Sequence, residues 1–163
     1  MSLEVTVQRL QDRVDIHELL YRYCRHADML DAVAMASLFV EDCEADFMNG
    51  QPPIVRGRNH LQEFFVTALQ HVVSGSHHIS NVELIFEGTD TVIAHTYMYS
   101  WQRFGGYPTT ADCHRWGRYE LRLMRRPEGW RFSRLRLFSA GEYGATRIAE
   151  QMGRPWPPRF PAT

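Results

Sequence analysis

The sequence predicts an α+β domain in which three N-terminal helices pack on a curved, mostly antiparallel sheet. Apolar residues recur at helical spacing in the first 71 residues, whereas apolar and polar residues alternate between residues 77 and 138. The first pattern is typical of amphipathic helices and the second of strands with one buried face. Three helices cannot cover both faces of such a sheet. We therefore expect the sheet to curve around them and to leave a pocket between the helices and its concave face.

Three helices are expected in the N-terminal half. The first covers residues 14–27 and places Asp28 at its end, and Asp31 then suits the N-cap of a second helix that continues to Phe39. A short strand is predicted at 43–48, and a loop rich in Gly and Pro at 49–57. Asn59, followed by Gln62 three residues later, has the pattern of a capping box for a third helix that ends near residue 71.

Four strands are expected after the third helix, at residues 77–86, 91–104, 114–125 and 130–138, separated by Gly- and Pro-containing turns. Residues 141–163 carry four prolines near their end and read as a C-terminal tail, so we expect one domain over 1–163. Strand alternation would leave Trp130 and Phe132 on an outer face. Burying such a face favours a homo-oligomer, either a dimer or a trimer.

Composition excludes several classes of function. Eighteen basic and nineteen acidic residues leave a net charge of −1, so we expect no nucleic acid and no anionic membrane as a partner. Every basic residue is Arg, which excludes a Schiff-base lysine and a phosphate-binding lysine. This charge balance favours partners that are small, uncharged molecules or other proteins.

Three widely spaced cysteines, Cys24, Cys43 and Cys113, indicate neither a disulfide framework nor a thiolate zinc site. No apolar stretch has the length of a signal peptide core or of a membrane span, so we expect a soluble, cytoplasmic protein. His26 and Asp28 lack a third ligand at suitable spacing. We therefore expect neither a metal nor another cofactor.

Tyr23, Asp28 and His77 are the residue types that proton abstraction requires. Asp28 ends an apolar helix five residues after Tyr23, and His77 opens a strand. A carboxylate beside an imidazole can orient the ring and keep it basic, and a tyrosine hydroxyl can hydrogen-bond a developing negative charge. The combination predicts a small acid–base enzyme. The competing interpretation is structural, because Asp is common in turns and an aromatic residue on an apolar helix face is usually part of a core.

Six short segments in a fixed order resemble the SnoaL-like branch of the NTF2-like (cystatin-like cone) superfamily over residues 10–140. They are residues 16–28 (IHELLYRYCRHAD), 38–43 (LFVEDC), 57–58 (GR), 77–81 (HHISN), and 117–120 with 129–132 (GRYE, GWRF). The resemblance implies the cone-shaped α+β fold. It is less specific for a reaction, because one fold can host many chemistries.

Within that superfamily the chain is most similar to scytalone dehydratase, hexachlorocyclohexane dehydrochlorinase and bile-acid 7α-dehydratase. The resemblance implies a catalytic pair of Asp28 and His77, with Tyr23 at the position of the tyrosine of the bile-acid enzyme. An arginine on the last strand completes the site in some relatives, but Leu135 aligns with it here. Strand alternation alone would place His78, not His77, on the apolar face, so His78 remains an alternative.

The resemblance also suggests substrate-binding residues on the strands. They are Met98, Ser100, Gln102, Tyr119, Leu121 and Leu135.

The expected function is a cofactor-free lyase that eliminates water or a similar group from a hydrophobic cyclic molecule such as a steroid, terpenoid or aromatic polyketide. His77, oriented by Asp28, would remove the proton. Two alternatives use the same fold. The pocket could serve an isomerase or cyclase, or the chain could be non-catalytic, as a ligand-binding protein or as the small subunit of a ring-hydroxylating dioxygenase.

Overall fold

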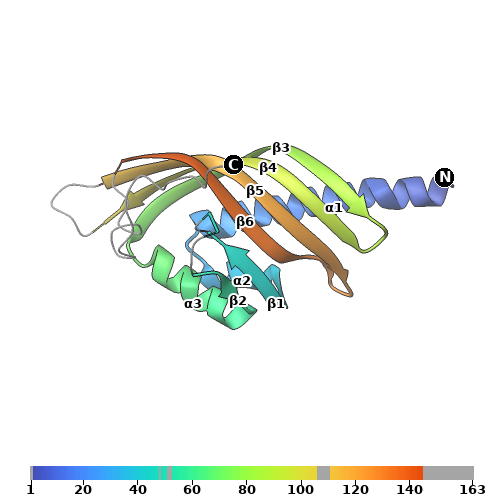
Figure 1. Cartoon of the computed structure of the whole chain (residues 1–163), viewed down its shortest axis with the longest axis horizontal. Helices are drawn as coiled ribbons and strands as arrows, with labels where there is room; N and C mark the ends of the chain where they lie inside the picture. Colours follow the sequence, from blue (N-terminus) through green and yellow to red (C-terminus); the bar gives the residue numbers. More distant parts are fainter. Residues whose placement is uncertain (1, 48, 51–52, 106–110, 145–163) are drawn as a thin grey trace.

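A computed structural model describes residues 2–47, 49–50, 53–105 and 111–144 of the chain. Figure 1 shows a curved sheet that arches over a long N-terminal helix, with two shorter helices grouped at one end of the sheet. The expected α+β architecture is therefore present. Residues 145–163, which make up most of the predicted tail, lie outside the described residues.

The sheet has six strands in the order β2-β1-β6-β5-β4-β3. Their bounds are β1 Phe39–Asp46, β2 Val55–Arg56, β3 Val72–Glu87, β4 Thr91–Phe104, β5 Ala111–Arg126 and β6 Gly129–Gly144. Strands β3 to β6 form an antiparallel meander, and β1 pairs with β6 in parallel. The prediction of a mostly antiparallel sheet is confirmed, and the strand predicted at 91–104 has the observed bounds.

Several predicted boundaries are wrong. Strand β1 begins at Phe39 instead of residue 43, so the second helix ends before Phe39. The loop predicted at 49–57 contains β2, which pairs with β1 over only two residues. Strand β6 continues to Gly144, and the segment expected to be tail from residue 141 thus begins as sheet.

The helices differ from the three packed helices that were expected. Helix α1 spans Leu3–Asp28, whereas α2 (Ala32–Ser37) and α3 (Arg58–Leu69) are short and pack mainly against each other and β1. Asp31 caps α2 as predicted, accepting a hydrogen bond from the Ala34 backbone N–H at 2.9 Å. The capping box at Asn59 is absent, because α3 begins one residue earlier, after Gly57, without a side-chain cap.

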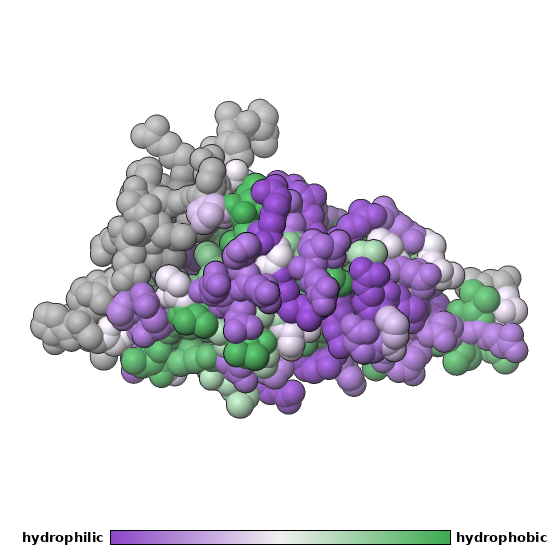
Figure 2. Space-filling model, turned by 90° about the horizontal axis from the view of Figure 1, so that it is seen from below, coloured by the Kyte–Doolittle hydropathy of each residue, from purple (hydrophilic) through white to green (hydrophobic). Residues whose placement is uncertain are grey.

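Helix α1 begins at Leu3, much earlier than expected, and its first turns precede Arg9, whose side chain contacts the Gly88 carbonyl and the Phe86 ring. Figure 1 shows these turns extending past the edge of the sheet, and Figure 2 shows hydrophobic residues at that end of the molecule. Leu3, Val7 and Leu10 are exposed there, so no buried stripe marks this part of the helix in the sequence. Ser2 caps the helix by accepting a hydrogen bond from the Val5 N–H. Within the described residues, no helix is long and apolar enough to cross a membrane.

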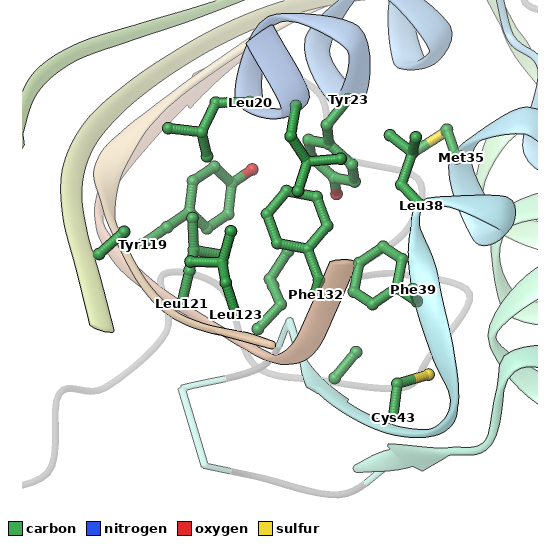
Figure 3. Packing of buried hydrophobic residues seen from close by; sticks show 14 of the residues in the cluster. Leu20, Tyr23, Met35, Leu38, Phe39, Cys43, Tyr119, Leu121, Leu123 and Phe132 are labelled. Atoms are coloured by element: carbon green, nitrogen blue, oxygen red, sulfur yellow. The ribbon is translucent and has the colours of Figure 1, made fainter. Parts of the chain in front are cut away.

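The core fills the concave side of the sheet between α1 and the short helices (Figure 3). Trp130 and Phe132 belong to this core with exposures of 3% and 1%, so the prediction that they face outward is wrong. The register explains the error. A bulge between β5 and β6 near Arg122 and Leu123 shifts the alternation of β6. The ring centroid of Phe132 consequently lies in the core, 5.0 Å from that of Phe39 on β1.

Candidate functional site

A cavity of about 90 Å³ lies between the concave face of the sheet and the helices. Its lining is mostly apolar, with one polar side formed by strands β3, β4 and β5. The lining residues from the helices and the end of β1 are Tyr23, Ala27, Met35, Phe47, Phe64, Phe65, Ala68 and Leu69. Those from the strands are His77, Met98, Ser100, Gln102, Arg115, Tyr119 and Leu137.

Asp28 and His77 meet at the edge of this cavity. The His77 Nδ1 atom lies 2.7 Å from the Asp28 Oδ1 atom, a hydrogen-bond distance. Asp28 is the last residue of α1, so the end of the helix carries its carboxylate to the start of β3. The His77 side chain is 14% exposed and lines the cavity, whereas the Asp28 side chain is 30% exposed and lies behind it. Asp28 is thus half-buried rather than fully enclosed.

A bulge in β3 decides which histidine faces the cavity. His77 pairs with Ser100 and Leu84 with Ala94, and the register shifts between Ser80 and Glu83. Asn81, within the shift, has a φ of 52°, in the left-handed region that Asn tolerates better than most residues. The extra residue brings His77 and the buried Leu84 to the same face of the sheet.

His78 therefore points away from the cavity. It is exposed, its Nε2 atom lies 2.9 Å from the Ser76 hydroxyl, and its ring packs near that of Tyr99. The structure thus resolves the choice between the two histidines in favour of His77 as the cavity-lining residue.

Tyr23 and Tyr119 enter the cavity from opposite sides, one from α1 and one from β5 (Figure 3). Their ring centroids are 6.4 Å apart and their planes are nearly perpendicular. Burial raises the pKa of both phenols, that of Tyr23 well above its ordinary value, so both hydroxyls remain protonated at neutral pH. Neither hydroxyl has a hydrogen-bond partner among the described residues. Both can therefore donate to a ligand.

Arg115 is a charged cavity residue that the sequence analysis missed. Its Nε–H donates a hydrogen bond to Glu142 Oε1, and the Glu142 side chain is only 3% exposed. Burial lowers the pKa of the Arg115 guanidinium, although an arginine stays charged throughout the physiological range. The alternation of the strand could have indicated it, because Arg115 lies four residues before Tyr119 on β5 and therefore faces the same side of the sheet.

The polar groups form one row across the sheet. His77 on β3 is opposite Ser100 on β4, Ser100 is opposite Arg115 on β5, and Arg115 is opposite Glu142 on β6. Directly opposite residues in an antiparallel sheet share a face. The hydrogen bond between Asp28 and His77 and the ion pair between Arg115 and Glu142 thus lie at the two ends of this row.

Four of the six predicted substrate-binding residues line the cavity, namely Met98, Ser100, Gln102 and Tyr119. Leu121 and Leu135 do not. They are directly opposite each other on β5 and β6 and are buried in the apolar core. Leu121 lies six residues beyond Arg115 along β5, on the same face of the sheet. They have the predicted face but the wrong depth.

The arginines that flank Leu135 on the last strand also point away from the cavity. Arg134 pairs with Glu44 at 3.2 Å, and Arg136 lies 3.8 Å from Glu120. Neither lines the cavity. The cationic group of this cavity is therefore Arg115, on the preceding strand.

His26 and Cys24 are two further reactive side chains on α1, close to Asp28 in the sequence. Within the described ranges, no cluster of three or more His, Cys, Asp or Glu residues could hold a metal ion, so His26 and Asp28 have no third ligand there. Burial, with a smaller contribution from Asp28, raises the pKa of the Cys24 thiol to about 12. A thiol with so high a pKa is a poor nucleophile at neutral pH.

The comparisons with known proteins identify the family and the fold of this chain. The sequence profile of the SnoaL-like domain family matches residues 8–136. The search of curated protein sequences finds no significant match.

Solved structures with the same fold cover nearly the whole chain. A protein from Novosphingobium aromaticivorans provisionally described as a scytalone dehydratase has 22% identity and a TM-score of 0.79, over 86% of this chain and 92% of that one. A hexachlorocyclohexane dehydrochlorinase, LinA type 2, has 19% identity and a TM-score of 0.75, over 88% and 95%.

An NTF2-like protein with a cystatin-like fold, also from N. aromaticivorans, has 25% identity and a TM-score of 0.66, over 92% of this chain and 94% of that one. Because the family profile spans most of the sequence and the fold agrees, this chain belongs to the SnoaL-like domain family of the NTF2-like superfamily.

Proposed function

We propose that the protein is a cofactor-free lyase that eliminates water from a hydrophobic cyclic small molecule, with His77 as the base. The observation that carries the proposal is the 2.7 Å contact between His77 and Asp28 at the edge of an apolar cavity. Two of the similar structures are described as a scytalone dehydratase, provisionally, and as a hexachlorocyclohexane dehydrochlorinase. Loss of water and loss of hydrogen chloride are both eliminations, which supports this class of reaction.

In this proposal each nitrogen of His77 has a separate role. When Nδ1 donates its proton to Asp28 Oδ1, the lone pair of a neutral imidazole is on Nε2, at the cavity side. Nε2 then removes an acidic C–H proton from the substrate, and Asp28 stabilises the imidazolium that forms. Tyr23, whose hydroxyl stays protonated, donates a hydrogen bond to the substrate oxygen that gains charge or departs.

The test is turnover of a panel of hydroxylated cyclic compounds, followed by mass spectrometry. Elimination lowers the product mass by one water. In a correctly folded protein, His77→Ala should lose most of the activity, whereas His78→Ala, at an exposed position on the outer face, should retain it. Wild-type turnover by His77→Ala would refute the proposal.

The same panel separates the alternatives. An isomerase or cyclase would give a product of unchanged mass that still depends on Asp28 and His77. A non-catalytic small subunit or a ligand-binding protein would bind a compound without turnover, and a dioxygenase subunit would in addition co-purify with a large iron-containing chain. The His–Asp contact favours the enzyme, because a purely structural subunit does not need a paired imidazole at its cavity.

We also propose that the protein is a homo-oligomer, either a dimer or a trimer. The support is no longer the pair Trp130 and Phe132, which are buried. It is a set of aromatic side chains exposed on β4, β5 and β6, namely Tyr97, Tyr99, Trp116 and Tyr143. Exposed aromatic residues on neighbouring strands are typical of interfaces. A monomeric mass in sedimentation equilibrium would contradict this proposal.

A further inference from the structure

We propose that Arg115 binds the carbonyl oxygen of the substrate, and that the substrate is an uncharged carbonyl compound. This inference rests on the proposed function and specifies its substrate class. The carbonyl acidifies the C–H that His77 removes, and the hydroxyl one carbon further along is the leaving group.

The position of Arg115 supports this role. His77 and Arg115 are each directly opposite Ser100 on β4. Since neighbouring strands lie about 4.8 Å apart, the backbones of His77 and Arg115 are roughly 10 Å apart. Both side chains line the same cavity, so a small ring bound over Ser100 can contact the base at one edge and the cation at the other.

Glu142 explains why the ligand should carry no charge before the reaction. The Glu142 carboxylate is buried and accepts the Nε–H of Arg115, so the pair is neutral overall. A substrate carboxylate would add a third, uncompensated charge in a mostly apolar cavity, which is costly. A neutral carbonyl avoids that cost and gains negative charge only in the transition state.

The terminal nitrogens of Arg115 are the donors that meet this charge. Within the described part of the chain, only Glu142 accepts a hydrogen bond from Arg115, and it does so at Nε. A guanidinium has five N–H donors, so those on the terminal nitrogens remain for a ligand. Because Glu142 holds the side chain in place, these donors are preorganised, which is the arrangement that favours a transition state over a ground state.

The proposed step balances without a co-reactant. His77 Nε2 takes the proton next to the carbonyl, and the electron pair of that C–H bond forms the C=C bond of an enolate whose oxygen is held by Arg115. The enolate then restores its C=O bond, a new C=C bond forms toward the neighbouring carbon, and the C–OH bond breaks. The departing oxygen takes the proton from the His77 imidazolium and leaves as water.

The experiment uses 4-nitrophenol as an enolate mimic, because its neutral and ionised forms differ in absorption. Wild-type protein should bind the probe as the phenolate and lower its apparent pKa. 4-Nitrotoluene, which has the same shape but no acidic group, measures apolar binding, and 4-nitrobenzoate measures binding of a carboxylate. We expect the phenolate to bind more tightly than either of these ligands.

Two variants remove the cation. Arg115→Gln leaves Glu142 buried and unpaired, so the double variant R115Q/E142Q, with two neutral hydrogen-bonding side chains, keeps the test valid if the single variant does not fold. The double variant should bind the phenolate about 10- to 100-fold more weakly, the usual effect of one or more hydrogen bonds to a charged group, and 4-nitrotoluene unchanged. Arg118→Gln, at an exposed position on the same strand, is the control and should leave both affinities unchanged.

Equal phenolate binding by wild type and R115Q/E142Q would refute the role of Arg115, and tightest binding of 4-nitrobenzoate would refute the neutral substrate class. These failures are distinct from failure of the proposed lyase, which is judged by the turnover of His77→Ala. On an active substrate, R115Q/E142Q should lower kcat much more than it raises KM. A variant that is merely less stable would keep a normal ratio of kcat to KM effects once the rates are expressed per folded molecule.

Discussion

Replacing Asp28 by Asn tests the proposed pair with the smallest change in shape. An amide removes the negative charge that opposes the imidazolium, and its NH₂ group can donate to His77 Nδ1, which would place the proton on Nε2. Two unit charges about 4 Å apart interact with about 4 kcal/mol at an effective dielectric constant of 20. Since the Asp28 side chain is 30% exposed, solvent weakens this interaction, and we expect a loss of about 2–3 kcal/mol.

That loss corresponds to roughly a 30- to 150-fold decrease in kcat, because each 1.4 kcal/mol is a factor of ten. The stability of the fold should change little, by no more than about 1 kcal/mol or a few degrees in Tm, because one partner is partly exposed. The assay compares turnover of the wild type and D28N on the same substrate, with thermal unfolding measured in parallel.

Asp31→Asn is the matched control. Asp31 lies three residues away, is exposed and caps α2, and Asn is as good an N-cap as Asp. D31N should therefore retain wild-type turnover. A folded D28N enzyme that loses less than about threefold in kcat would refute the reasoning, because the carboxylate would then have no part in the proton transfer.

Three further predictions concern the scaffold. Leu123→Ala should destabilise the protein by about 2–5 kcal/mol in chemical denaturation, whereas Ile85→Ala, on an exposed strand position, should cost less than about 1 kcal/mol. Burial raises the pKa of Asp12, but hydrogen bonds, above all that from Arg125, outweigh it and leave the pKa lowered. The ionised Asp12 therefore stabilises the fold above its unfolded-state pKa, and this stabilisation is lost as the pH falls through its lower folded-state pKa. The variant Asp12→Asn should be less stable than the wild type at pH 7, and this difference in stability should vanish in strong acid. Cys24 should react with a thiol reagent at pH 8 only after unfolding, because its thiol is buried with a pKa of about 12.

The meander of strands could be predicted because each strand alternates clearly and ends at a Gly or Pro turn. β4, for example, has buried residues at every second position from Val92 to Ser100. The start of α1 and the strand β2 could not be predicted. The first turns of α1 bury no stripe of side chains, and β2 consists of two residues that are a strand only because β1 lies beside them.

The site was predictable in its residue types but not in its full geometry. The order of motifs indicated Asp28 and His77, whereas simple alternation pointed to His78, because the bulge at Asn81 has no clear mark in the sequence. Alternation identifies a face of a strand but not a depth along it. Leu121 therefore shares a face with Arg115 and yet lies in the core. The contact between Arg115 and Glu142 could not be predicted either, because it depends on a second bulge, in β6.

The most direct test of the central claim is the protonation of the two His77 nitrogens, measured by ¹⁵N NMR at a pH where the ring is neutral. The signals are assigned by their loss in His77→Gln. We predict that Nδ1 carries the proton, shared with Asp28, and that Nε2 is unprotonated and able to accept a proton from carbon. A neutral ring with its proton on Nε2 would contradict the account, because the atom assigned to remove the substrate proton would already hold one.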